Sequence, residues 1–175
     1  MDKVVLTQYE KDLIKKNKQY IIDGDWDGFF NDMETYDDFG EFKTTNIFRF
    51  CLECVPDLLY KITKLPYYAY AGSDIKSINL PNNIKDIRNF AFYSCGHLEQ
   101  IKFPDNLKYI GFDVFCFCDN LKKLYIPDSV TEIGWSAFAY CDRLKHISIP
   151  KHLEKNIRVD CSECLPEDCE IEVRE

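Results

Sequence analysis

The sequence predicts an α+β solenoid, in which coils with a 23-residue period stack behind an all-helical N-terminal cap. Four prolines, Pro81, Pro104, Pro127 and Pro150, share this spacing. The same apolar offsets recur around each proline, whereas the segment 1–63 lacks this period and shows helical spacing. A fixed period of roughly 20–50 residues is the signature of a repeat architecture, because one unit cannot bury its apolar face alone.

Each coil is expected to hold one strand and to contribute to one shared core. Apolar residues stand six, three and one position before each proline, as Leu121, Leu124 and Ile126 do in the third unit. The alternation Leu124-Tyr125-Ile126 has the period of a strand with one face in the core and one in solvent. Gly134 follows the isoleucine that closes this pattern, Ile133, where the missing Cβ atom would allow a bend.

The period divides the chain into three parts. Residues 1–63 form a helical module, residues 64–156 hold the units 64–86, 87–109, 110–132 and 133–155, and residues 157–175 form a degenerate last repeat. The first unit departs from the others, because Gly72 takes the position that Cys95, Cys118 and Cys141 fill later. These three cysteines are expected to form a stacked row in the core.

A last strand is predicted at the C-terminal end of the sequence. One residue is inserted after Pro150, so that Ile171 and Val173 fall on the strand offsets of the preceding unit. The acidic residues that alternate with them, Glu170 and Glu172, are expected to face solvent, as suits a terminal strand whose open edge must discourage pairing.

The repeated pattern IPxxVxxIGxxAFxxCxxLxxI resembles the BspA-type leucine-rich repeat family over roughly residues 64–155. This resemblance implies a right-handed leucine-rich-repeat-like coil and a role in recognition or adhesion. Many relatives act at the cell surface. Small intracellular proteins that join a helical module to a few such repeats also resemble products of phages or other mobile elements, and by analogy this chain is expected to act on a host factor.

Composition restricts the class of protein. The chain has 175 residues, a net charge of -8 and nine cysteines. The negative charge argues against a general nucleic-acid binder, because binding phosphates needs a cationic surface. The start of the sequence shows no export signal and no later stretch is apolar enough to span a bilayer, so a cytoplasmic location with reduced thiols is expected.

The N-terminal module is predicted to be helical. Thr7 and Glu10 form a capping box before a first helix that runs to Gly24. A second helix starts near Trp26, a third covers 47–55, and a short fourth covers 57–63. We interpret the module as a cover for the open apolar end of the solenoid.

The segment DGDWDGFFNDME at 23–34 allows two interpretations. Its acidic residues and glycine fit the spacing of a calcium-binding loop. The candidate ligands are Asp23, Asp25, Asp27, Asn31 and Glu34. The same segment also fits an amphipathic helix capped by Asp25, which is favoured because Trp26 stands where calcium loops carry a small polar residue.

Cysteine pairs suggest a second metal hypothesis. Cys161 and Cys164, with the later Cys169, give an incomplete zinc-ligand pattern. The other pair, Cys51 and Cys54, lies at the opposite end of the solenoid, roughly 20 Å away if four coils are stacked at strand spacing. One site shared by the two pairs is therefore not expected.

The exposed strand positions are the best candidate for a binding surface. Nine residues form this predicted site: Lys76, Asn79, Gln100, Lys102, Lys122, Lys123, Tyr125, Lys145 and His146. Their cationic character predicts a protein partner with an acidic surface, bound without catalysis or a cofactor, because no catalytic motif is present. The alternatives are a calcium- or zinc-dependent regulator, or lysines that only solubilise exposed strands.

Overall fold

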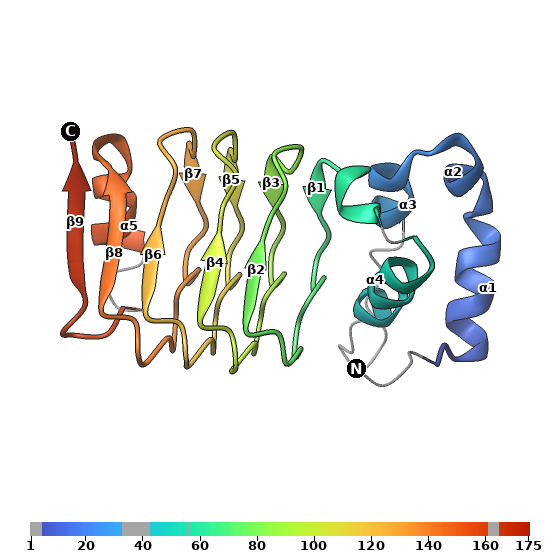
Figure 1. Cartoon of the computed structure of the whole chain (residues 1–175), viewed down its shortest axis with the longest axis horizontal. Helices are drawn as coiled ribbons and strands as arrows, with labels where there is room; N and C mark the ends of the chain where they lie inside the picture. Colours follow the sequence, from blue (N-terminus) through green and yellow to red (C-terminus); the bar gives the residue numbers. More distant parts are fainter. Residues whose placement is uncertain (1–4, 33–42, 56, 161–164) are drawn as a thin grey trace.

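The chain forms an elongated stack, with helices at one end and parallel strands along the rest (Figure 1). The computed structural model describes residues 5–32, 43–55, 57–160 and 165–175. Its helices are α1 (Gln8–Lys16), α2 (Lys18–Asp23), α3 (Trp26–Asp32), α4 (Lys43–Cys54) and α5 (Glu154–Asp160), with 3-10 turns η1 (Leu58–Tyr60) and η2 (Lys151–Leu153). In this part of the chain, no helix combines the length and apolar character needed to cross a membrane.

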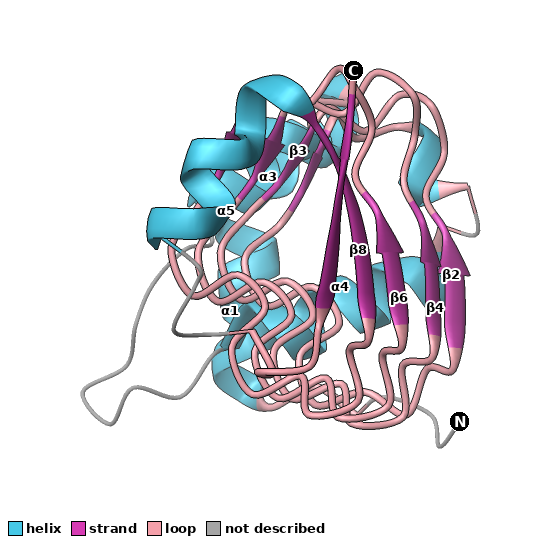
Figure 2. Cartoon of the chain, turned by 90° about the vertical axis from the view of Figure 1, so that its left-hand side faces the viewer, coloured by secondary structure: helices cyan, strands magenta, loops and turns pink. Residues whose placement is uncertain are grey.

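The strands form two rows on opposite sides of the stack (Figure 2). They are β1 (Lys64–Leu65), β2 (Ser77–Asn79), β3 (Asp86–Ile87), β4 (Gln100–Lys102), β5 (Tyr109–Ile110), β6 (Lys123–Tyr125), β7 (Glu132–Ile133), β8 (His146–Pro150) and β9 (Glu170–Arg174). One row is the continuous sheet β1-β3-β5-β7, and the other consists of the sheets β2-β4 and β6-β8-β9. All pairings are parallel, so each coil lies on the previous one.

The pairing register follows the apolar offsets. Ile87 pairs with Ile110 and Ile110 with Ile133, each one full period further along the chain. Leu65 pairs with Ile87, which is one position closer than that period. The first coil is therefore one residue shorter than the coils that follow it.

The shorter first coil corrects the expected role of Gly72. The Gly72 amide donates to the carbonyl of Tyr93, as the Ser94 amide donates to that of Cys116, so Gly72 is equivalent to Ser94. Both residues have positive φ, 64° and 55°. The residue beside Cys95 is Ser73, whose hydroxyl lies 3.5 Å from the Cys95 thiol. The alignment of Gly72 with Cys95 was wrong because the missing residue lies after Ser73.

The last strand has the register that the inserted residue predicts. Ile147 pairs with Ile171 and Ile149 with Val173, one position further apart than the period of the earlier coils. The ladder of inward-facing apolar side chains thus continues into β9, and β9 is the last strand of its row.

The core is built from rows of identical side chains. Phe92, Phe115 and Phe138 are fully buried, and their rings stack in parallel with centroids 5.3 Å and 6.0 Å apart. Tyr70 begins this row, 5.3 Å from Phe92. Such a column can exist only if successive coils keep the same register.

The predicted cysteine row lies in the core beside the aromatic column. Cys95, Cys118 and Cys141 are fully buried free thiols. The Cys118 thiol donates to the Phe92 carbonyl at 3.2 Å, and the Cys141 thiol donates to the Phe115 carbonyl at 3.1 Å. Each thiol therefore links its own coil to the preceding one.

Gly134 is required by the close approach of a neighbouring coil. A Cβ atom built on Gly134 would lie 2.3 Å from the amide nitrogen of Phe112. Gly111 meets the same obstacle, 2.4 Å from the side-chain oxygen of Asn89. Glycine is therefore needed at Gly134 as predicted, but for a reason other than a bend. The main chains of two neighbouring coils lie in contact there.

The N-terminal helices follow most of their predicted signals. The capping box is present, with the Glu10 amide donating to the Thr7 hydroxyl at 3.2 Å. The first helical stretch is divided at Asn17 into α1 and α2, and α2 ends at Gly24 with φ 73°. The expected helix over 57–63 is reduced to the single turn η1. The module contacts the solenoid core, with the rings of Phe48 and Tyr70 centred 5.7 Å apart.

Phe115→Ala is expected to lower the free energy of unfolding by about 3–5 kcal/mol, because it opens a cavity in the fully buried column. Urea unfolding followed by circular dichroism measures this change. Lys108→Ala, at an exposed position, is the control and should have little effect. Equal small losses in both variants would show that the column does not carry the stability.

The buried thiols predict a loss of stability in alkali. Burial raises the pKa of the Cys141 thiol to about 12, whereas the same thiol in an unfolded chain ionises near its ordinary pKa of about 8.5. The thiol's contribution to stability is therefore complete below about pH 8.5 and is lost as the pH rises toward 12. Urea unfolding near pH 8 and near pH 10.5 should show this decline, and Cys141→Ala should reduce it.

Candidate binding surface

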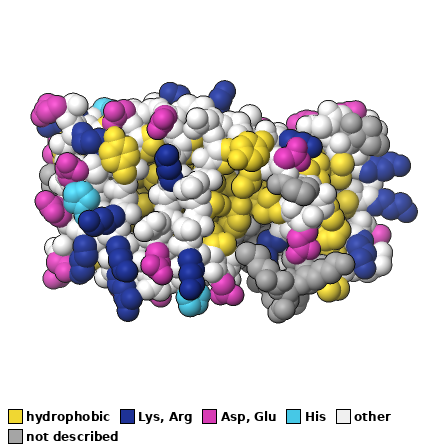
Figure 3. Space-filling model, viewed as in Figure 1, with side chains coloured by type: hydrophobic (Ala, Val, Ile, Leu, Met, Phe, Trp, Pro, Cys, Tyr) yellow, Lys and Arg dark blue, Asp and Glu magenta, His cyan; other side chains and the backbone are white. Residues whose placement is uncertain are grey.

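The solvent-facing side chains of β2, β4, β6 and β8 make up the surface called here the strand face, together with the residue just before each strand. This residue is Lys76, Lys122 or Lys145 before β2, β6 and β8, and Glu99 before β4. Dark-blue cationic side chains run along this side in Figure 3. Eight of the nine predicted residues are exposed: Lys76, Asn79, Gln100, Lys102, Lys122, Lys123, Tyr125 and Lys145. His146 is half-buried.

The strand face is interrupted between β4 and β6. Among the described residues these neighbouring strands belong to two separate sheets. A hollow of about 670 Å³ lies across the interruption. Gln100 and Ile101 line it on one side, and Lys123, Leu124 and Tyr125 on the other.

Arg174 of β9 organises the far end of this hollow. Its guanidinium donates to the Ser148 hydroxyl at 2.8 Å, to the Ile126 carbonyl at 2.5 Å and to the Asp128 carboxylate at 2.7 Å. The same group lies over the Tyr125 ring, 4.0 Å from its centre. Ser148 is buried, although it alternates with the inward-facing Ile147 and Ile149 along β8 and would be expected to face solvent.

The acids around β9 neutralise the end of the predicted cationic strip. Lys145 forms an ion pair with Asp168, and this contact holds the pKa of that carboxyl below its usual value. His146 lies 3.6 Å from Glu170 and 3.3 Å from Glu172. Hydrogen bonds from Ser148 and then His146 lower the pKa of Glu172.

Within the described residues, no ion pair involves Lys76, Lys102, Lys122 or Lys123. The strand face thus divides into a cationic part over β2, β4 and β6 and a neutralised part over β8. This division was missed from the sequence, although the predicted register of the last strand already placed Glu170 beside His146 and Glu172 beside Ser148.

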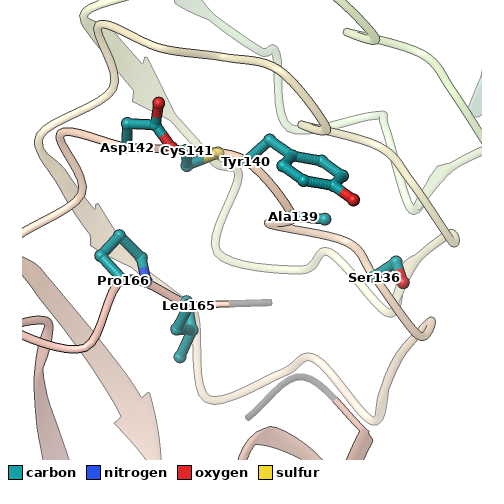
Figure 4. A pocket seen from close by; sticks show the side chains of 7 residues that line it. All are labelled: Ser136, Ala139, Tyr140, Cys141, Asp142, Leu165 and Pro166. Carbon is teal, nitrogen blue, oxygen red and sulfur yellow. The ribbon is translucent and has the colours of Figure 1, made fainter. Parts of the chain in front are cut away.

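A smaller hollow of about 250 Å³ opens beside the turn that precedes β8 (Figure 4). Tyr140 and Asp142 line it together with Leu165. The Tyr140 ring is 63% exposed and stacks on Phe117 at 4.6 Å. The Cys141 thiol at this hollow donates a hydrogen bond to the Phe115 carbonyl, and burial raises its pKa. Because the thiolate is the nucleophilic form, this cysteine is poorly suited to act as a nucleophile.

The family model of the BspA type leucine rich repeat region matches residues 45–163 with six copies. The chain belongs to this family. Its repeat fold is in general a protein-interaction module, and the match covers the whole strand face. The family to which the pattern pointed is therefore confirmed, together with a solenoid of stacked parallel coils.

Solved leucine-rich repeat proteins share the fold. A leucine rich cell surface protein from Faecalibacterium prausnitzii is 25% identical with a TM-score of 0.57, and the match covers 66% of this chain and 30% of that one. The pneumococcal vaccine antigen PcpA is 19% identical with a TM-score of 0.50, over 66% of this chain and 40% of that one. This chain thus spans less than half the length of either protein. No curated protein sequence matches it.

The candidate calcium loop of this leucine-rich repeat protein is helical from Trp26 to Asp32. Residues 26–32 form α3, and the Asp25 carboxylate caps it by accepting from the Gly28 amide at 2.9 Å. Asp23 accepts from Gln19. The Asn31 side chain and Glu34 lie outside the described residues. The helix favoured by the sequence is confirmed.

Asp27 connects α3 to the first coil. Its carboxylate accepts hydrogen bonds from the Thr63 amide at 3.1 Å, the Thr63 hydroxyl at 2.5 Å and the Lys64 amide at 3.1 Å. Residue 64 begins β1. A side chain considered as a metal ligand therefore fixes the helical module to the repeats.

The zinc hypothesis involves residues of which few are described. Cys161 and Cys164 lie outside the described residues, and Cys169 is half-buried. In the part of the chain that is described, no three histidine, cysteine or acidic side chains are grouped as metal ligands. Burial raises the pKa of the Cys51 thiol to about 12, which makes it a poor ligand beside Cys54.

Asp27→Asn is expected to lower the free energy of unfolding by about 1.5–3 kcal/mol, because it removes the charge from three hydrogen bonds. Hydrogen exchange should show faster exchange at Thr63 and Lys64. Asp23→Asn, which alters an exposed contact within α2, is the matched control. Equal exchange at Thr63 and Lys64 in both variants would contradict the connecting role.

Proposed function

We propose that this leucine-rich repeat protein is a non-enzymatic interaction module, which binds an acidic protein surface through the strand face over β2, β4 and β6. The observation that carries the proposal is a group of four exposed lysines, Lys76, Lys102, Lys122 and Lys123, which form no ion pair within the described residues. Lys122 and Lys123 line the hollow between β4 and β6. Repeat proteins use such extended surfaces for recognition. The neutralised segment over β8 bounds the site on one side.

Tyr125 supplies a fixed aromatic contact for the partner. Its ring is 58% exposed, and Arg174 holds it from one side. Tyrosine and arginine are enriched where binding energy concentrates, and tyrosine buries a large area at a small cost in conformational entropy. The ring therefore gives the hollow an apolar wall that is already ordered before binding.

The lysines contribute chiefly to the speed and selectivity of association. The protein as a whole is acidic, so a local cationic strip orients an approaching acidic surface toward the strand face. Such steering raises the association rate and weakens with salt. The acidic surfaces of this protein outside the strand face would repel the acidic partner, which disfavours encounters in other orientations.

We also propose that the 23-residue coil is the building unit and that the helical module caps the first coil. Two contacts support this role. Phe48 of α4 packs against Tyr70, at the start of the core column, and Asp27 of α3 holds the main chain at Thr63 and Lys64. A cap would keep the first coil's apolar side from water.

The double variant Lys102→Glu with Lys123→Glu is expected to weaken partner binding by at least roughly tenfold, because it places acids against an acidic partner. Proteins captured by the tagged chain would be identified by mass spectrometry, and each would then be measured in purified form at several salt concentrations. Tyr125→Ala tests the aromatic contact in the same assay.

Lys85→Glu with Lys108→Glu is the matched control, because it makes the same charge change at exposed positions beside the other row of strands. The control should keep both the affinity and its salt dependence. Equal losses in both double variants would mean that only net charge matters. No loss in the first would move the binding site away from the strand face.

A further inference from the structure

Among the described strands, β9 is the last of its row, and its outer edge is unpaired. It pairs with β8 on one side, and it is the last strand in its sheet. Figures 1 and 2 show β9 at the end of the molecule, with α5 lying against the other side of the stack. Among the described residues, no strand lies on its outer side.

The hydrogen-bond pattern of the earlier coils shows which groups of β9 face outward. The Leu80 amide donates to Lys102, and the Ile126 amide donates to Ser148, each in the next coil. Val173 occupies the same position in β9. The Glu170 amide instead donates back to Lys145. Because main-chain groups alternate in direction along a strand, the amides of Ile171 and Val173 point away from β8.

The apolar ladder is incompletely covered at the same edge. Ile147 and Ile149 of β8 are fully buried, whereas their partners Ile171 and Val173 are only half-buried. The equivalent Leu124 of β6, which lies beneath β8, is buried as well. A further strand with apolar side chains at alternate positions would cover Ile171 and Val173. Its main-chain carbonyls would accept hydrogen bonds from the outward amides of these two residues.

The charges on β9 select which strand can pair. The side chains of Glu170 and Glu172 are 78% and 53% exposed. Like charges placed side by side on adjacent strands are unfavourable, whereas opposite charges are favourable. These acids therefore disfavour a second copy that presents its own β9, and they favour a strand with basic residues between its apolar ones.

We propose that the outer edge of β9 is a second binding site, which accepts a parallel strand of a partner protein with alternating apolar and basic side chains. Apolar residues would extend the ladder beyond Ile171 and Val173. Basic residues would lie beside Glu170 and Glu172. This site is independent of the strand-face proposal, since the two surfaces select opposite charges.

The test uses a short blocked peptide that alternates lysine with valine, added to the full chain and followed by fluorescence anisotropy and hydrogen exchange. We expect the amides of Ile171 and Val173 to become protected. A twin peptide with glutamate in place of lysine should bind about tenfold more weakly, because its acids face those of β9. N-methylation of the main-chain groups of the lysine peptide that face β9 should abolish binding.

Glu170→Lys with Glu172→Lys should reverse the preference between the two peptides. Asp105→Lys with Glu132→Lys makes the same charge change at exposed positions outside β9, and it should leave the preference intact. Urea unfolding would establish that each variant is folded. The proposal is overturned if the β9 amides stay unprotected, or if Lys102→Glu with Lys123→Glu abolishes peptide binding. Sedimentation that shows copies already paired through β9 would also overturn it.

Discussion

The structure depends on one requirement, that each coil is covered by the next at a constant separation. The columns built on Phe115 and Cys118 exist only because equivalent side chains meet at every step. Gly134 is a consequence of the same requirement, because the main chains of neighbouring coils leave no room for a Cβ atom. The core therefore has little tolerance for a shift along the axis, while the outward positions are free to vary in chemistry.

The two ends of the stack meet this requirement differently. At the first coil, Phe48 of α4 contacts Tyr70, and Asp27 of α3 accepts hydrogen bonds from the main chain of Thr63 and Lys64. At the last coil, β9 continues the ladder, and no described strand covers its outer side. Binding is expected where side chains do not have to pack against a neighbouring coil. Such positions lie on the strand face and at the outer edge of β9.

Much of the architecture could be predicted from the sequence because the period is rigid. The strand register, the buried cysteine row, and the partners of Ile171 and Val173 all follow from counting. Gly72 was misplaced because a single missing residue shifts the offsets without changing the apolar pattern. The state of His146 and Ser148 could not be predicted, since it depends on Arg174 and Glu172, which reach them only after β9 has paired with β8. The spacing places Glu170 and Glu172 beside His146 and Ser148, but it does not indicate the contacts of the Arg174 side chain.

The interruption between β4 and β6 has a mechanical consequence. Main-chain hydrogen bonds link all four strands of one row, so that row resists stretching along the axis. Among the described strands, the other row lacks this link at a single junction, where neighbouring coils can separate more easily. If the molecule is bent, the junction between β4 and β6 should open before the other junctions do. This opening would widen the hollow that Tyr125 lines. A force applied to the two ends would thus alter the shape of the surface between them.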